Sequence, residues 1–371
     1  MRYAVAPVSD KKRLDEFLRL PFAIYRGDPL WVPPVASEVR RTLDPERNPY
    51  FAESALRLFL GYRDGAPVAR LAVVINPAHQ RASGVRTAFF GFFESADDER
   101  AARRLFGEAE TFCRTRGVKV LEGPFNPHHY SELGLQIDSF GTAPSFFQAY
   151  NPPYYGRLLE KAGYGISARL QTMKNDDIGN YLAARFGTLE SPPDGSRYTV
   201  RSFSLEDKAG DLERMREVNN DAFAENRHFL PLSREEYAFA AKYSSLVTRP
   251  DLIKFVERDG RPVGVLHCVL DVNPLLRSWN GAAGPIKLLK FLRDRKAVKT
   301  IIIFTVAIKE EHRHSRVHQL LIAEFCRMAR SFERAETTWI SADNQPALRN
   351  AERLGMRPDK RFVLYAKELG S

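Results

Sequence analysis

The stretch RDGAPVARLAVV at residues 63–74 returns as RDGRPVGVLHCV at residues 258–269. In both copies Asp-Gly separates two apolar runs, and Asp-Gly between such runs is a strong signal for a two-residue β-hairpin turn. The same hairpin is therefore predicted twice, at distant places in one chain. This repetition indicates that a whole strand-rich unit occurs twice.

Two further echoes flank the hairpins and support this interpretation. Arg2-Tyr3 returns as Arg197-Tyr198, and LEKAGY at 159–164 is echoed by AERLGM at 351–356. The echoes keep the same order and nearly the same spacing as the hairpins. Repeats of this kind are typical of a duplicated domain.

A linker is expected between the two copies. The segment SPPDGS at 191–196 contains the proline and glycine that commonly interrupt regular structure. We therefore predict an N-terminal domain over residues 1–190 and a C-terminal domain over residues 197–371. A chain of 371 residues is also long for a single core.

Within each copy, apolar strands alternate with amphipathic helices in the order β-α-β-β-β-α-β-α-β. This order predicts an α/β fold with a mixed sheet and helices on both faces. The main predicted helices lie at 11–20, 99–117, 211–223 and 317–332, and the strands that precede the second helix of each copy lie at 86–94 and 299–308.

Composition limits the cellular setting. Hydrophobic residues make up 44% and charged residues 27% of the chain, which is ordinary for a soluble globular protein. No stretch is long and apolar enough to span a membrane, and the first residues lack the apolar core of a secretory signal. Three separate cysteines fit reduced thiols. We expect a cytoplasmic protein.

Several segments resemble the GNAT acyltransferase superfamily. The hairpin, the strand-to-helix junction and the segment NQPALRNAERLGM at 344–356 carry the general resemblance. The segments DPLWVPP at 28–34, FFGFFE at 89–94 and YNPPYY at 150–155 are similar to a poorly characterised bacterial group with two GNAT units. The resemblance implies two tandem GNAT-like domains, each a mixed, mostly antiparallel sheet flanked by helices.

The resemblance also implies an acyl-CoA co-substrate, acetyl-CoA or another acyl-CoA. Its pyrophosphate is expected at the N-terminus of the helix that begins near Val317, in the segment EHRHSRVHQLL at 311–321. The glycines of the family pattern are absent there. Two interpretations stay open: arginine and histidine side chains bind the phosphates directly, or the site has decayed. The predicted donor-binding residues are Val306, Ala307, Ile308, Arg313, His314, Ser315, Arg316, Val317, His318, Asn344 and Asn350.

The corresponding junction of the first copy is acidic. Ser95 is expected to cap the helix, with Asp97, Asp98 and Glu99 in its first turn. These carboxylates would repel a pyrophosphate, so the first domain is expected to be a scaffold or substrate lobe. No metal site is expected, because the spaced pair His314 and His318 has no obvious third ligand.

Candidate catalytic residues are Glu225 and His228 as bases, with Asp343 beside the expected cleft. Asn344 has a competing interpretation as the cap of the helix that follows it. The polar loop at 123–134 and the neighbouring NPPYY segment are the best candidates for the acceptor site. The predicted acceptor-binding residues are Asn126, His128, His129, Tyr130, Glu132 and Asn151.

The sequence thus predicts an N-acyltransferase that moves an acyl group, expected to be acetyl, to a small amine or amino-acid-like acceptor. Two alternatives are a non-catalytic GNAT-fold binding or sensing protein and an aminoacyl-tRNA-dependent transferase. Neither a membrane nor a nucleic acid other than tRNA is expected as a partner, and the oligomeric state is left open. The basic stretch KLLKFLRDRKAVK at 287–299 is predicted to be an amphipathic cover helix, whose basic side contacts CoA, an acyl carrier protein or RNA, or is simply solvated.

Overall fold

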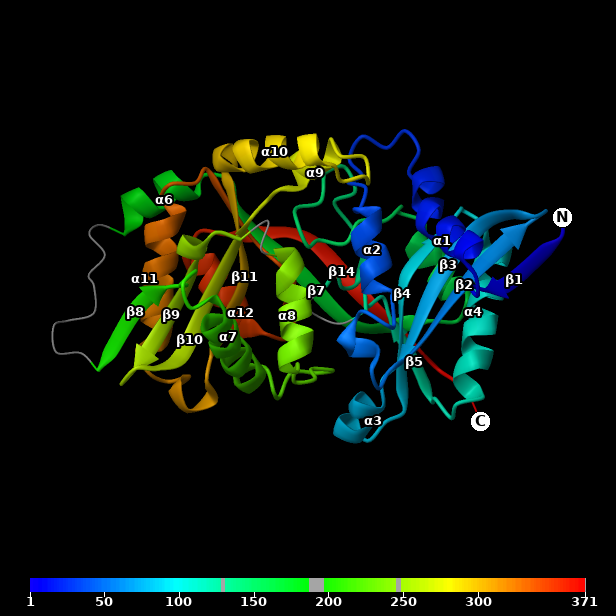
Figure 1. Cartoon of the computed structure of the whole chain (residues 1–371), viewed down its shortest axis with the longest axis horizontal. Helices are drawn as coiled ribbons and strands as arrows, with labels where there is room; N and C mark the ends of the chain where they lie inside the picture. Colours follow the sequence, from blue (N-terminus) through cyan, green and yellow to red (C-terminus); the bar gives the residue numbers. More distant parts are fainter. Residues whose placement is uncertain (128–130, 187–196, 245–247, 371) are drawn as a thin grey trace.

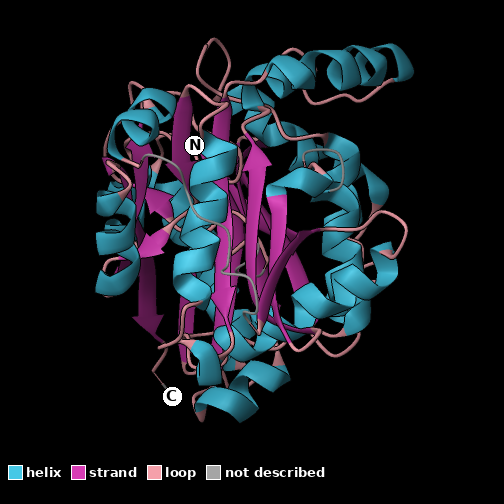
Figure 2. Cartoon of the chain, turned by 90° about the vertical axis from the view of Figure 1, so that its left-hand side faces the viewer, coloured by secondary structure: helices cyan, strands magenta, loops and turns pink. Residues whose placement is uncertain are grey.

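The computed structural model describes residues 1–127, 131–186, 197–244 and 248–370. Within these residues the strands form one 14-stranded sheet, whose main path runs β1-β2-β3-β4-β5-β14-β7-β12-β11-β10-β9-β8. Helices cover the sheet on both sides (Figure 2). The predicted fold class, an α/β fold with a mixed sheet and helices on both faces, is confirmed.

The N-terminal half supplies seven strands and six helices of the described chain. Its strands are β1 (Tyr3–Pro7), β2 (Ala55–Arg63), β3 (Ala66–Ile75), β4 (Thr87–Ser95), β5 (Val120–Gly123), β6 (Leu135–Gln136) and β7 (Gly165–Asn175). Its α-helices are α1 (Lys11–Ile24), α2 (Ala36–Thr42), α3 (Pro77–Ser83), α4 (Glu99–Arg114), α5 (Tyr155–Lys161) and α6 (Ile178–Arg185).

The C-terminal half follows a similar order. Its strands are β8 (Tyr198–Ser202), β9 (Ile253–Arg258), β10 (Arg261–Leu270), β11 (Thr300–Ile308), β12 (Arg334–Thr337), β13 (Ile340–Ser341) and β14 (Arg357–Glu368). Its α-helices are α7 (Lys208–Ala222), α8 (Arg234–Ser244), α9 (Asn273–Arg277), α10 (Pro285–Asp294), α11 (Val317–Ala329) and α12 (Gln345–Arg353), and a short 3-10 turn, η4 (Glu310–His312), precedes α11. Here α9 and α10 stand in place of α3, and no helix follows the last strand among the described residues.

Both predicted hairpins are present, β2–β3 and β9–β10. Asp64 and Gly65 have φ angles of 50° and 85°, and Asp259 and Gly260 have 50° and 75°. Two consecutive positive φ angles define the turn whose twist matches that of the flanking strands, and glycine adopts them without a steric penalty. The repeated Asp-Gly pairs therefore fix the register of the two equivalent hairpins.

The two halves exchange their last strands. β14 pairs antiparallel with β5 on one side and with β7 on the other. β7 pairs in turn with β12, where Ala335 lies opposite Asn175. The last strand of each half therefore lies against a strand of the other half (Figure 1). The predicted boundary at 190 lies outside the described residues and the one at 197 is the first described residue after this gap, so both stay predictions.

The exchange is reflected in the hydrophobic cores. Val363 and Tyr365 of β14 are buried in the core that α4 and α5 of the N-terminal half build. Met173 of β7 and Ile178 and Leu182 of α6 are buried in the core around α11 of the C-terminal half. Each core is therefore incomplete without residues from the other half.

Two predicted strands are shorter than expected. The segment VKVLEGPF yields only β5, because the chain turns toward β4 after Gly123. The segment TTWIS is divided between β12 and β13, where the chain leaves β11 and joins β7. Both interruptions lie where β4 or β11 separates from its parallel neighbour.

Among the described residues, no helix combines the length and apolar character needed to cross a bilayer.

The strand exchange predicts that residues 1–190 do not fold alone. Without β14, this fragment lacks Val363 and Tyr365 in its core and leaves β5 unpaired on one side. We expect a broad thermal transition and dye binding to exposed apolar surface, and we expect a sharp transition once residues 357–368 are attached through a flexible linker. Circular dichroism melting measures both. A sharp transition of the unextended fragment would contradict the exchange.

Candidate functional site

A cavity of about 650 Å³ lies between the two halves. Residues of α2 and α8 line it from opposite halves, and these helices are neighbours in Figure 1. They also touch, since the Arg41 guanidinium lies 4.0 Å from the centre of the Phe239 ring. A space of this volume is typical of sites that enclose a ligand of several hundred daltons.

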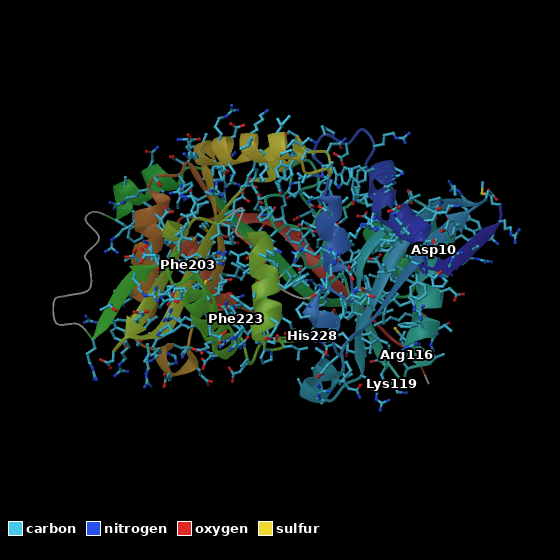
Figure 3. The ribbon with its side chains drawn as sticks, in the orientation of Figure 1. Asp10, Arg116, Lys119, Phe203, Phe223 and His228 are labelled. Atoms are coloured by element: carbon cyan, nitrogen blue, oxygen red, sulfur yellow. The ribbon has the colours of Figure 1, made fainter. Side chains whose placement is uncertain are left out.

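The walls of the cavity are largely apolar and come from both halves. Trp31 stacks on Tyr25 with a centroid separation of 4.8 Å, and Phe147 packs against Phe304 of β11 at 4.7 Å. Phe203, which Figure 3 labels, and Met215 line the C-terminal side. Such walls favour a hydrocarbon ligand, because they offer it few hydrogen bonds and remove its surface from water.

The N-terminal end of the cavity, which we call the polar floor, is built around Glu94 at the end of β4. The hydroxyls of Tyr25 and Tyr155 donate to Glu94 Oε2 at 2.9 and 2.7 Å. Arg70 Nη2 lies 3.6 Å from Glu94 Oε1. Burial raises the pKa of Glu94, although Arg70 and both tyrosines oppose this effect. Arg70 Nε is buried and has no hydrogen-bond partner among the described residues.

Glu132 is the second carboxylate of the polar floor. Its side chain lines the cavity and is exposed there. Burial, together with the nearby charge of Glu94, raises the pKa of Glu132 to about 7. A carboxylate with this pKa can accept a proton at neutral pH.

The two carboxylates face one buried cation, Arg70, so their full ionisation leaves an excess of negative charge in the polar floor. An ammonium group would relieve this excess, because an opposite charge stabilises both ionised carboxylates. The polar floor is therefore suited to bind an amine in its protonated form and then remove a proton from it.

The three segments with the narrower family resemblance converge on this end of the cavity. DPLWVPP supplies Trp31 to the wall, FFGFFE supplies Glu94, and YNPPYY supplies Tyr155. One signal in the sequence could have identified Glu94: a carboxylate at the end of an apolar strand. Arg70 within the apolar strand β3 is a similar signal, since buried charges are rarely found without a partner.

The junction at β11 is open. Its parallel pairing with β12 extends from Thr300 to Ile303, and the chain then separates from β11. Val306, a predicted donor contact, is 42% exposed beyond this point. The side chain of Ala307 is buried in the core under α7, and Ile308 is half-buried, so these two offer chiefly their backbone. The cavity reaches this strand at Phe304.

The equivalent junction at β4 is closed by the chain itself. Phe125 N donates to the Phe90 carbonyl at 2.7 Å, and Asn126 Oδ1 accepts from Phe92 N at 2.7 Å. A Cβ atom on Gly91 would lie 1.8 Å from the Phe125 carbonyl oxygen, so only glycine permits this approach. The side-chain oxygen of the predicted acceptor residue Asn126 is therefore bound to the backbone of β4 and helps to close this junction.

The acids that follow β4 are already paired. Asp98, rather than the predicted Ser95, caps α4 by accepting from Ala101 N at 3.0 Å; Ser95 is the last residue of β4. Arg63 donates to Asp98 at 2.9 Å, and Arg157 pairs with both Asp97 and Glu99. Arginines thus neutralise these acids beside the closed junction, and the expectation that the first unit does not bind CoA stays a prediction.

The basic turn before α11 contains groups with different partners. Arg313 donates to Glu225 Oε2 and to the Ala222 carbonyl, both at 3.1 Å. His312 is buried, with its Nε2 3.3 Å from Glu311 Oε1. These two side chains are therefore engaged with the protein, and Glu225 is an exposed ion-pair partner far from the polar floor rather than a base within it.

The remaining groups of the turn are more accessible. His314 and Arg316 are exposed, and their side chains have no hydrogen-bond or ion-pair partner in the described part of the chain. Ser315 Oγ lies 3.3 Å from Val317 N at the start of α11. His318 and Asn350 bind each other at 2.8 Å and so join α11 to α12. His314 and Arg316 are the two side chains that remain available to an anion.

His228 lies at the junction of the two halves, as Figure 3 shows, and belongs to a separate cluster. Its Nε2 is 2.8 Å from Glu122 Oε2, and its Nδ1 is 2.8 Å from His79 Nε2. Arg227 also donates to Glu122 at 3.0 Å. Burial and the neighbouring His228 lower the pKa of His79 to about 4. The cluster joins β5 and α3 to the loop after α7, and His228 is not a residue that lines the cavity.

Other predicted residues have structural partners. Asn344 caps α12 by accepting from Ala347 N at 3.2 Å, and Asp343 is exposed beside it. Asn151 Oδ1 accepts from Gln136 N at 2.7 Å, which fixes β6. Of the predicted acceptor loop, Glu132 is the residue that presents an ionisable group to the cavity. His128, His129 and Tyr130 lie outside the described residues.

His267 of β10 is another cavity residue that was not predicted from the sequence. It lines the cavity, with its ring centre 5.2 Å from that of Phe304 and its Nε2 3.3 Å from Thr248 Oγ1. Burial lowers the pKa of His267 to about 4, so the ring is neutral at pH 7. A histidine within an otherwise apolar strand was the available signal.

Comparisons with known proteins agree with this geometry. Residues 212–356 match the model of the acetyltransferase (GNAT) family. The whole chain is similar to a solved tandem GNAT protein from the clavulanic acid biosynthesis pathway, with a TM-score of 0.59, 16% identity and coverage of 100% of this chain and 99% of that one. Residues 212–356 thus match the GNAT family, and the whole chain has the fold of a tandem GNAT protein.

Two curated relatives are similar to this chain over nearly its full length. Protein YghO of Escherichia coli (strain K12) is 26% identical over 370 residues, which cover 97% of this chain and 94% of the relative. A bacterial ceramide synthase of Caulobacter vibrioides (strain NA1000 / CB15N) is 28% identical over 377 residues, which cover 99% and 97%.

The raised pKa of Glu132 predicts a pH-dependent effect on stability. Folding raises this pKa from 4.5 to about 7, so the fold favours the protonated form and wild type loses stability as pH rises through this range. Glu132→Gln resembles the protonated form and should melt above wild type by an amount that grows from pH 5 to pH 8. Exposed Glu108→Gln is the control. A pH-independent difference would contradict the assignment.

Proposed function

We propose that this protein is an N-acyltransferase that transfers a long, apolar acyl group from a thioester to an amine that carries its own hydrocarbon chain. The observation that supports this proposal is the cavity of about 650 Å³, which has apolar walls and two carboxylates in its polar floor. The GNAT fold supports acyl transfer as the reaction class.

The cavity argues for substrates larger than those expected from the sequence. An acetyl group and a small amine would leave most of its apolar wall in contact with water. A hydrocarbon chain gains roughly 0.8 kcal/mol for each CH₂ group that it buries. The Caulobacter relative is named a ceramide synthase, and a ceramide is an amide of a fatty acid with a long-chain amino alcohol. This name supports the same substrate class here.

The open junction of the second unit is the proposed entry of the thioester. Its carbonyl would lie beside β11 near Val306, and its acyl chain would continue past Phe304 into the cavity. His314 and Arg316 are the side chains available to a phosphate of the donor. The absent glycines then matter less, because these side chains, rather than close backbone contact, supply the anion-binding groups.

The polar floor supplies the acid–base chemistry. Glu132 accepts a proton from the substrate ammonium, and the free amine attacks the thioester carbonyl. The new C–N bond forms as the C–S bond breaks, and the thiolate leaves with the second proton of the amine. Glu94, held by Tyr25 and Tyr155, places a second carboxylate beside the ammonium.

The substrate class is tested by thiol release with acyl-CoA donors from two to eighteen carbons and with short- and long-chain primary amines. We expect kcat/KM to rise steeply with the chain length of both substrates, by a few-fold for each added CH₂ until the cavity is filled. A preference for acetyl-CoA and small amines would overturn the proposal.

The role of Glu132 is tested by the pH profile of kcat/KM with a long-chain amine. Below its pKa of about 7, Glu132 is protonated and cannot accept a proton, so the rate should fall tenfold for each pH unit. Glu132→Gln should lower kcat by about 100-fold or more and remove this limb. Glu108→Gln should keep both, and retention of the limb in Glu132→Gln would exclude Glu132 as the base.

A second candidate, a non-catalytic lipid-binding protein, is favoured by one observation: Arg313, the arginine that aligns with the family pattern, is tied to Glu225. Calorimetry with a long-chain acyl-CoA separates the two. Binding that weakens in His314→Ala and Arg316→Ala supports the enzyme, whereas binding of long-chain amines alone supports the second candidate.

A further inference from the structure

The helix α10 has an inner face that the core explains. Phe291 is 2% exposed and packs against Trp279 with a centroid separation of 5.5 Å. Leu288 and Leu292 are half-buried against the same core. Lys287 Nζ donates to the Trp279 carbonyl at 2.6 Å and to the Ala282 carbonyl at 3.1 Å, which holds the start of the helix in place.

The outer face of α10 is apolar where no core covers it. Ile286 is 81% exposed and Leu289 is 69% exposed. The two residues are three positions apart, so they are neighbours on one helical face. Pro285, which precedes them, is exposed as well. Neighbouring exposed aliphatic side chains of this size commonly mark an interaction surface.

Basic side chains surround these two residues. Lys290 and Arg293 are exposed on the same helix, and Lys296 and Lys299 are exposed just after it. Asp294 is the acid of the helix, and Arg293 binds it at 2.7 Å. An apolar face bordered by lysines is typical of helices that lie in the interface of an anionic bilayer.

The position of α10 connects this surface to the cavity. The helix lies along the upper edge of the molecule in Figure 1. In the turn before it, the Gly281 carbonyl accepts from Ala36 N at 2.9 Å, and Arg277 of α9 donates to the Leu30 carbonyl at 3.4 Å. The segment between these contacts, residues 31–35, lines the cavity.

We propose that α10 docks this protein on an anionic lipid bilayer. Ile286 and Leu289 enter the boundary between headgroups and acyl chains, while Lys290 and Lys296 lie at the lipid phosphates. Docking in this way places the cavity wall at residues 31–35 beside the membrane, where substrates with long hydrocarbon chains are concentrated. A membrane is thereby proposed as a partner, although none was expected from the sequence. The evidence for docking is the surface of α10, and it does not depend on the proposed reaction.

The test is sedimentation of the full chain with vesicles of phosphatidylcholine alone or mixed with phosphatidylglycerol, without substrate. We expect binding to the anionic vesicles that weakens at high salt. Ile286→Ser with Leu289→Ser should abolish most of it. Lys290→Gln with Lys296→Gln should weaken it by about fivefold for each lysine near the surface.

Matched controls separate docking from general effects. Val85→Ser removes a 46% exposed aliphatic side chain on the other half, and Lys11→Gln with Lys12→Gln removes two exposed lysines there. Both controls should bind as wild type does, and all variants should melt as wild type does. With substrates dissolved in detergent micelles, the α10 variants should keep wild-type acyl transfer, so failed catalysis and failed docking are distinguishable.

Three outcomes would overturn the proposal. The first is that the wild-type protein does not sediment with anionic vesicles beyond its level with phosphatidylcholine. The second is that the Ile286 and Leu289 variant binds as well as wild type. The third is that a purified acidic acyl carrier protein binds α10 while the vesicles do not, which would assign the surface to a protein partner.

Discussion

The antiparallel ladder between β7 and β14 is the constraint on which the rest of the structure depends. It replaces two separate sheets by one, and it buries Val363 and Tyr365 in one core and Met173 in the other. Neither half can move away without breaking strand pairs and exposing both cores. The cavity between the halves is therefore a fixed feature of the fold, with walls and polar groups held from both sides.

The two units differ at the junction that follows their fourth strand. In the first, Asn126 and Phe125 close the junction at β4, and Arg63 and Arg157 neutralise the acids that follow. In the second, the junction at β11 is open at Val306. The first unit instead supplies the polar floor with Glu94 and Glu132. We therefore propose that the donor binds in the second copy and that the first copy supplies the acceptor chemistry.

Local patterns in the sequence predicted most of the fold. The Asp-Gly turns and the apolar periodicity of α4 and α11 depend on neighbouring residues, and both predictions are confirmed. The strand exchange was not predicted, because β7 and β14 have the same local pattern whichever partner they take.

For the site, Glu132 was proposed from its polar loop, but Glu94, Arg70 and His267 were missed. Their environment is created by residues far apart in the sequence. Glu225, Asp343 and His228 were chosen by residue type, and the structure places them in a surface ion pair, beside a helix cap and in a buried cluster.

The most direct test of the central claim is covalent mapping of the cavity. A long-chain acyl-CoA with a photoreactive group at the end of its chain is bound to the protein, irradiated, and the labelled peptides are identified by mass spectrometry. We expect label on cavity-lining segments from both halves, at residues 31–39 and 203–219. We also expect this labelling to disappear when unlabelled long-chain acyl-CoA competes for the cavity. Label confined to the outer surface, or unchanged by the competitor, would contradict the assignment of this cavity to the acyl chain.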